Sequence, residues 1–380
     1  MDFKFSEEQL ALKDTLSRFI AKDYGFEQRR ALGKSEAGFS RDHWRRFADL
    51  GVLALPYPEE FGGLGGNAVD TLLVMEMLGR GLVLEPYLAT VVLAGGLIRD
   101  AGSQAQKAEF LPAIAAGELL LALAHHEPGA RYETRHVATV ARRDGDGYRM
   151  DGAKAVVISG PSADKLVVSA RTSGGHRDET GISLFLVDAQ AAGVRLRGYP
   201  TQDGGRAAEI DFHCVRLPAS ALIGAEGGAL PAIERALDHA IAALCAEAVG
   251  IMAAVNEATL DYLKTRRQFG QPIGSFQALQ HRMVDMVIAT EQARSMALLA
   301  AVRVDTPDVA LRRRSVSAAK AHIGQQARSV GQQAVQLHGG MGVVDELMVS
   351  HHFKRLTMIN ATYGDADHHL GLFGDTLLAA

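Results

Sequence analysis

Cysteine is scarce in this chain. Only Cys214 and Cys245 occur among 380 residues, and they lie far apart in the sequence. Two cysteines in a chain of this length do not make a disulfide framework or a cysteine-based metal site, so we expect two reduced thiols and a cytoplasmic protein. The cluster of acidic residues and histidines from Asp365 to His369 lacks further ligands at metal-binding spacing, so no metal site is predicted.

An excess of one charge and long apolar runs are also lacking. The net charge is −4, which gives no electrostatic reason to expect binding to nucleic acid or to an anionic membrane. No uninterrupted run of about 18 apolar residues appears, so membrane insertion is not expected. Residues 1–8 do not have the basic and then apolar regions of a signal peptide.

The length and the changes in hydrophobic period predict three domains. Residues 1–120 are expected to be helical, because Ser6 can cap a helix with Gln9 at the capping-box position and apolar residues then recur at helical spacing. The glycine-rich stretch 61–66 is expected to be a loop. It is not a P-loop, since no Lys-Ser/Thr pair follows it.

The middle of the chain, residues 121–226, has the pattern of short strands separated by turns. The expected strands are residues 148–152, 166–170, 181–187 and 210–213. Such strands predict an antiparallel β-barrel or sandwich. In residues 227–380, long apolar runs joined by short loops predict a helix bundle.

The predicted bundle carries two polar motifs, Arg266-Arg267-Gln268-Phe269-Gly270 and Gln336-Leu337-His338-Gly339-Gly340. Arg266 offers a fork of donors that suits a pyrophosphate, and Phe269 offers a flat face. Gly339 and Gly340 would let backbone N–H groups approach an anion. The residues alone leave two interpretations open, a nucleotide site or a bundle turn with a helix-ending glycine.

These motifs, in this order of domains, resemble the flavin-dependent acyl-CoA dehydrogenase family over nearly the whole chain. The resemblance implies the acyl-CoA dehydrogenase fold, with an α-helical N-terminal domain, a β middle domain and a C-terminal four-helix bundle. It also implies FAD, an acyl-CoA substrate from fatty acid or dicarboxylate β-oxidation, and an electron-transfer flavoprotein as acceptor. In the family, the adenosine part of FAD is held across a subunit boundary of a tetramer. The residues that match this half-site are Arg266, Gln268, Phe269, Gln336, Gly339 and Gly340.

The two loops that face the flavin ring in the family are altered. The family's Thr-Glu-Pro-Gly-Ala-Gly-Ser-Asp loop corresponds to residues 126–133, in which His126 and Tyr132 replace hydroxyl residues. The family's Asn-Gly-x-Lys-x-Trp-Ile-Thr-Asn loop ends at Ser159. There, Val156 replaces the tryptophan that shields the ring and Ile158 replaces a hydroxyl near it. His126, Tyr132 and Ile158 are therefore at cofactor-binding positions, with changed chemistry where the protein tunes the ring.

The family's catalytic base is also altered. Tyr363 stands where most members have the glutamate that removes the α-proton, and a phenol with a pKa of about 10 is a poor base at neutral pH. Ala240 stands where another branch places its base. Glu247 is the only charge in an apolar run, so it is either a relocated base with a raised pKa or a core glutamate paired with an Arg or His.

Within the family, the chain most resembles the small partner subunits of heteromeric enzymes, such as that of pimeloyl-CoA dehydrogenase. A retained adenosine half-site without a base favours such a subunit, in a heterotetramer with a large acyl-CoA dehydrogenase subunit. The alternatives are an active homotetramer that uses Glu247 and an acyl-CoA dehydrogenase-like flavin oxidase.

Overall fold

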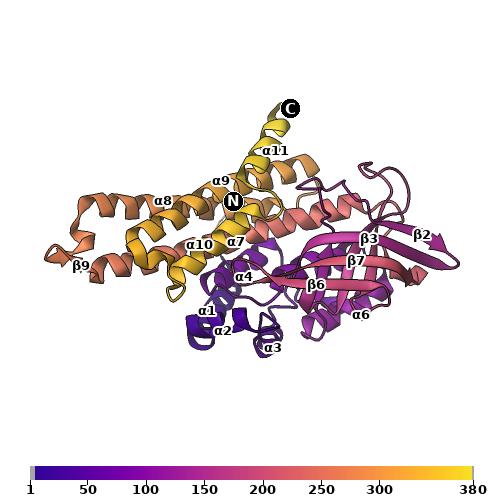
Figure 1. Cartoon of the computed structure of the whole chain (residues 1–380), viewed down its shortest axis with the longest axis horizontal. Coiled ribbons are helices and arrows are strands. Elements are labelled where there is room, and N and C mark those ends of the chain that lie inside the picture. Colours follow the sequence, from indigo (N-terminus) through magenta and orange to yellow (C-terminus); the bar gives the residue numbers. More distant parts are fainter. Residues whose placement is uncertain (1–4, 379–380) are drawn as a thin grey trace. The chain divides into compact units, whose positions relative to one another are not determined.

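The computed structural model describes residues 5–378, which form two compact units (Figure 1). Unit 1 consists of residues 5–31, 68–83 and 241–378, and unit 2 consists of residues 32–67 and 84–240. Part of the stretch considered for a signal peptide, residues 1–4, lies outside the described residues.

Unit 1 is built from helices and one short hairpin. Its elements are α1 (Glu7–Asp23), the first part of α2 (Phe26–Lys34), α4 (Ala68–Arg80), most of α7 (Leu230–Thr265), β9 (Arg267–Gln268), β10 (Gln271–Pro272), α8 (Gln277–Arg303), α9 (Val309–His338), α10 (Met348–Ala361) and α11 (Ala366–Leu378). Figure 1 shows α8, α9 and α10 running beside one another, and α9 packs against α8, α10 and α11. The predicted C-terminal helix bundle is confirmed.

Local sequence explains where these helices begin and how closely they pack. Ser6 accepts a hydrogen bond from the backbone of Gln9, and the Gln9 side chain accepts one from the backbone of Ser6, as the capping-box pattern predicts. Helices α4 and α7 cross at two glycines. A Cβ atom at Gly79 would collide with the carbonyl of Glu247, and one at Gly250 would collide with that of Glu76. The two backbones touch here because neither glycine has a side chain.

Unit 2 combines short helices with an eight-stranded sheet. The helices are α3 (Arg41–Asp49), the π-helix η2 (Leu88–Ala94), α5 (Gly95–Ala101) and α6 (Gln104–Ala115). The strands are β1 (Leu121–Ala124), β2 (Val140–Asp144), β3 (Gly147–Ile158), β4 (Lys165–Arg171), β5 (Ile182–Asp188), β6 (Val194–Pro200), β7 (Arg206–Leu217) and β8 (Leu222–Ile223). The four predicted strands are confirmed within β3, β4, β5 and β7, although the predicted strand 181–187 begins one residue before β5.

The sheet runs in the order β6-β7-β3-β2-β4-β5-β8, with β1 added beside β4. Most pairs are antiparallel, as predicted, but β4 pairs in parallel with both β1 and β2. A parallel pair needs a crossover connection, and the period of single strands does not reveal one. Alternate residues of β2, β3 and β7 form the core of the unit, including Ala141, Tyr148, Met150, Val215 and Leu217.

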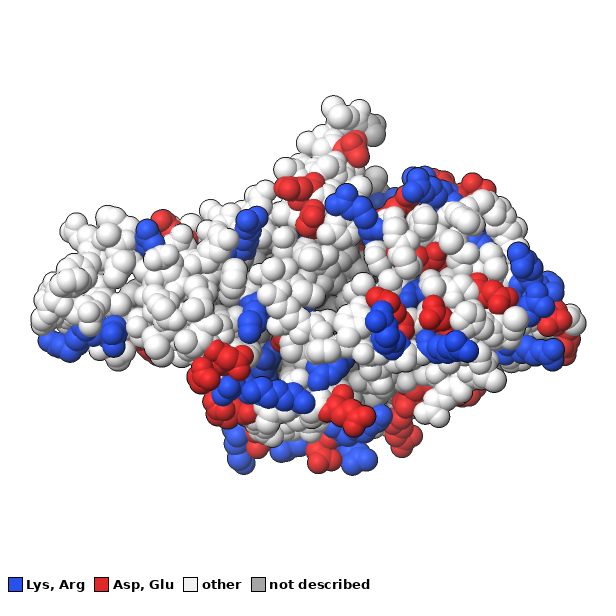
Figure 2. Space-filling model, in the orientation of Figure 1, with Lys and Arg blue, Asp and Glu red and all other residues white. Residues whose placement is uncertain are grey.

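The structure also bears on the expectations about nucleic acid, membranes and metal ions. Acidic and basic side chains are interspersed over the face shown in Figure 2. Helix α7 is long and apolar enough to cross a membrane, although the sequence contains no uninterrupted apolar run. However, 83% of its most apolar window is buried, and the core helix of a globular protein passes the same test. Both cysteines are free thiols, and no metal-binding group is found within residues 5–378.

Candidate functional site

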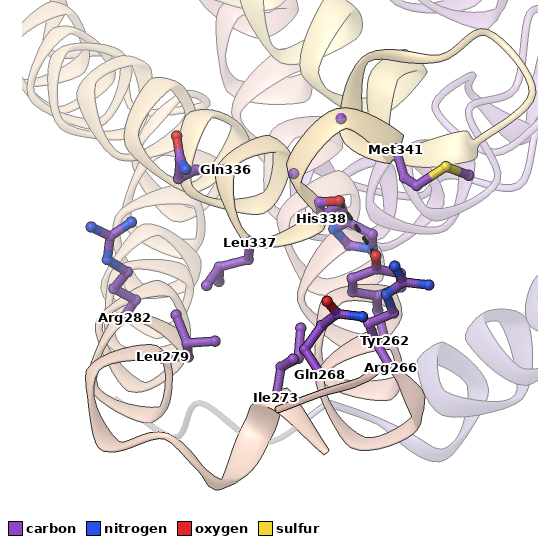
Figure 3. A pocket seen from close by; sticks show the side chains of 12 residues that line it. Tyr262, Arg266, Gln268, Ile273, Leu279, Arg282, Gln336, Leu337, His338 and Met341 are labelled. Carbon is purple, nitrogen blue, oxygen red and sulfur yellow. Dashed lines mark hydrogen bonds between the residues drawn. The ribbon is translucent and has the colours of Figure 1, made fainter. Parts of the chain in front are cut away.

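The two polar motifs of the C-terminal region meet at one pocket of unit 1 (Figure 3). This pocket has a volume of about 480 Å³ and lies where α7 and α9 end. Five of the six predicted half-site residues line it, namely Arg266, Gln268, Gln336, Gly339 and Gly340. A volume of this size suits part of a dinucleotide.

The first motif forms the β9–β10 hairpin. Phe269 and Gly270 occupy its turn with φ of 54° and 81°, the left-handed conformation that a two-residue hairpin turn requires. Phe269 is the exception among the predicted residues, because it does not line the pocket. Phe269 is 90% exposed, and its ring lies edge to face with that of Phe276, at 6.0 Å between centroids. A bulky residue in this conformation is strained, which is typical of a functional position.

The second motif closes the pocket from the end of α9. The His338 ring stacks on Tyr262 with centroids 4.4 Å apart, and the Tyr262 hydroxyl donates to the His338 carbonyl at 3.5 Å. Burial lowers the pKa of His338, so this imidazole is neutral. Gly339 follows with φ of 59°, and Cβ atoms added at Gly339 or Gly340 would meet nothing within 4 Å. The backbone of this loop is therefore open to a ligand.

The sequence did not single out several other residues that line the pocket. They are Tyr262, Ile273, Leu279, Arg282, Leu337, His338 and Met341. Tyr262 lies one helical turn before Arg266, so helical spacing could have identified it. Two arginines and no carboxylate line the pocket among the described residues. This donor set fits the pyrophosphate and base of an adenine dinucleotide.

In unit 2, the two altered ring loops are held together by a buried ion pair. The Lys154 ammonium donates to Glu127 at 2.7 Å and to the Ser169 hydroxyl at 2.9 Å, and both charged side chains are at most 3% exposed. Glu127 also accepts backbone N–H groups of Ala138 and Thr139 at 2.6 and 3.0 Å. Burial lowers the pKa of Lys154 to about 8. Burial alone would raise the pKa of Glu127, but the Lys154 charge holds it below its ordinary value.

The predicted ring-side residues differ in their exposure. His126 is exposed, and its carbonyl accepts from the N–H of Ala155 at 2.9 Å, which joins the two loops. Tyr132 and Ile158 are half-buried. Val156, at the position of the family's tryptophan, has φ of 51° and is 49% exposed. No aromatic side chain is thus supplied at that position.

The structure pairs Glu247 with an arginine, as the alternative interpretation of this residue expects. Arg355 donates from Nε and Nη2 to the two carboxylate oxygens at 2.6 and 2.7 Å. Glu247 is 5% exposed. Each carboxylate oxygen thus accepts from the arginine, and little of the group is open to a substrate.

Tyr363 lies in a rigid turn between α10 and α11. Its φ is 56°, and burial raises the pKa of its phenol above the ordinary value. The buried ammonium of Lys320 donates to the carbonyls of Ile359 and Thr362 at 2.6 and 2.8 Å, which satisfies the end of α10. Asp365 accepts from the backbone N–H of His368 at 2.8 Å and caps α11. The turn is well formed, but it carries a phenol and no free carboxylate.

Comparisons with known proteins agree with this architecture. The family models of the acyl-CoA dehydrogenase N-terminal, middle and C-terminal domains match residues 6–118, 122–215 and 227–378. A probable acyl-CoA dehydrogenase of Bacillus subtilis, YngJ, is 29% identical over 377 residues, which is 97% of each chain.

Two solved structures are also similar. A variant of the Tcur3481-Tcur3483 steroid ACAD has a TM-score of 0.88 and 29% identity over 98% of both chains. An FAD complex of PigA has a TM-score of 0.91 and 27% identity over 99% of both chains. The family and this complex support the prediction of FAD. With three domain models covering most of its length, the chain belongs to the acyl-CoA dehydrogenase family.

Proposed function

We propose that this chain is a partner subunit of a heteromeric, FAD-dependent acyl-CoA dehydrogenase. In this complex, the pocket at Arg266 would bind the adenosine pyrophosphate of an FAD. A second, larger subunit would bind the reacting flavin ring of the same FAD. The observation that carries the proposal is a formed half-site together with two candidate base positions, Tyr363 and Glu247, neither of which offers a free carboxylate. Five half-site residues line one pocket, whereas the base position holds Tyr363 and the buried Glu247 is paired with Arg355.

The reaction of the complex would convert an acyl-CoA to a trans-2-enoyl-CoA. A carboxylate of the larger subunit takes the α-proton, and the β-hydrogen leaves with its electron pair. A bound FAD would supply the hydride acceptor for this step, with an electron-transfer flavoprotein as the final acceptor of the electrons. In this chain, Arg266 and the open backbone at Gly339 and Gly340 bind the pyrophosphate. The ion pair of Lys154 and Glu127 holds the ring loops in one arrangement.

Two similarities favour a complex of this kind. The name of the similar Tcur3481-Tcur3483 steroid ACAD joins two components. Another similar structure, with a TM-score of 0.92 and 27% identity, is described as an electron-transferring flavoprotein of Acidaminococcus fermentans. A heterotetramer, a cytoplasmic location and a dicarboxylyl-CoA substrate stay predictions from the sequence.

The exposed position of Phe269 also supports a shared site. A strained, exposed aromatic ring at a hairpin tip has little to stabilise it within unit 1. Its flat face can pack against the cofactor of a neighbouring subunit when the complex forms.

The proposal can be tested by FAD retention in the co-purified complex. Arg266→Leu should lower FAD affinity about 10- to 100-fold, since a hydrogen bond to a charged group contributes about 1.5–3 kcal/mol. Arg267→Leu is the matched control, because its guanidinium donates to the Gly270 carbonyl at 3.1 Å and does not line the pocket. Full retention of FAD by the Arg266 variant would contradict the half-site.

A further inference from the structure

Arg282 is a cationic lining residue that the family motifs do not explain. It lies on α8, across the pocket from Arg266 (Figure 3). Its guanidinium has one long hydrogen bond, from Nη1 to the Gln333 side chain at 3.4 Å. No carboxylate within residues 5–378 forms an ion pair with it. An arginine without a counter-charge in a pocket is available to a ligand.

The pocket has a charged end and an apolar middle. Arg266 lies one turn after Tyr262, whose ring stacks on His338, and Gly339 follows His338. Arg266 and the open glycine loop therefore share one wall, which suits phosphate groups. The apolar side chains of Ile273, Leu279 and Leu337 occupy the middle, and Arg282 and Gln336 lie on the wall beyond them (Figure 3).

This arrangement separates two kinds of recognition. A phosphate group requires donors and positive charge, which Arg266 and the glycine loop supply. A purine ring requires apolar contacts, a cation or flat group over its face and polar groups at its edge. The wall that holds Arg282 and Gln336 supplies the second set, since a glutamine can both donate and accept at an adenine edge.

We propose that Arg282 is a binding residue for the adenine base of the nucleotide and not for its phosphates. The guanidinium packs on or beside the purine ring, which rests on the three apolar side chains, while Gln336 faces the ring edge. This inference rests on the proposed function of the pocket as an adenosine half-site.

The test is titration calorimetry of the co-purified complex, stripped of its flavin, with two probes, ADP and inorganic pyrophosphate. Arg282 is exposed, so Arg282→Leu should weaken ADP binding about two- to fivefold, as expected for loss of a cation–π contact at an exposed site, and should change pyrophosphate binding less than twofold. Arg282→Lys should lose most of the ADP affinity too, because a lysine keeps the charge without the flat group. Arg266→Leu should weaken the binding of both probes. Arg328→Leu, an exposed arginine on α9 that does not line the pocket, is the control.

The outcomes distinguish the inference from the function on which it rests. If the unchanged complex binds both probes and Arg282→Leu behaves like Arg328→Leu, Arg282 does not bind the base. If Arg282→Leu weakens the binding of pyrophosphate as much as the binding of ADP, Arg282 is a phosphate ligand and the inference is wrong. If the unchanged complex, stripped of flavin, binds neither probe, the adenosine half-site itself is refuted, and the role of Arg282 with it.

Discussion

Replacing Lys154 with methionine should strongly destabilise unit 2. Its ammonium is fully buried and makes an ion pair with Glu127 at 2.7 Å. Removing one partner of a buried pair leaves an uncompensated charge and costs about 3–5 kcal/mol. For a urea dependence of roughly 2–3 kcal/mol per M, the unfolding midpoint should fall by about 1–2.5 M.

The only tryptophan makes this change measurable. Trp44 is fully buried within unit 2, so its fluorescence reports the unfolding of the unit that contains Lys154. Lys165→Met is the control, because Lys165 and Asp188 form a solvent-exposed pair at 3.5 Å that is worth less than about 1 kcal/mol. Adding Glu127→Gln to the Lys154 variant should recover part of the loss. Equal midpoints for the Lys154 and Lys165 variants would refute the reasoning.

Four further predictions concern unit 1. Burial lowers the pKa of His369 to about 4. In the unfolded chain this imidazole has a pKa of about 6.5, so between pH 6.5 and 4 it binds a proton in the unfolded state but not in the folded state. The free energy of unfolding should therefore fall by up to about 3 kcal/mol as the pH drops through this window. His369→Gln should remove this part of the acid sensitivity of the melting temperature, and an unchanged pH profile would show that His369 is not responsible. Glu247→Gln should lower the unfolding free energy by about 1.5–3 kcal/mol, because it removes the charge that pairs with the partly exposed Arg355, while flavin reduction in the complex persists. Loss of reduction in a folded variant would favour the homomeric enzyme. Tyr363→Glu should let an acyl-CoA bleach the flavin of the FAD-saturated chain under anaerobic conditions, since the turn is already formed. No bleaching would show that more than the base is missing. Gly339→Ala should cost about 1–3 kcal/mol and weaken FAD binding, because its φ of 59° strains a side chain. A variant as stable as the unchanged chain would contradict the strain.

The sequence predicted the parts of the site that depend on local signals. The cap at Ser6 and the strands around Leu166 follow from residue types and period, and the structure confirms them. The polar loops at Arg266 and Gly339 belong to motifs that resemble the family's adenosine half-site. That resemblance implied that the two loops would meet, and they line one pocket.

Features that depend on distant contacts could not be predicted in the same way. Arg355 lies 108 residues from Glu247, so the sequence left the pairing of that carboxylate open. Strand β6 is different, because Val194 and Leu196 alternate with Arg195 and Arg197, so a local signal for this strand was present in the sequence. The parallel pairing of β4 with β1 and β2 depends on how the chain crosses over, which the strand pattern does not contain.

The measurement that tests the account most directly is the visible spectrum and flavin content of this chain, purified alone and then with a candidate large subunit. We expect the chain purified alone to contain little flavin. In the complex we expect about one FAD per pair of subunits, with bleaching by an acyl-CoA. One FAD per chain in the isolated protein, bleached by an acyl-CoA, would contradict the account.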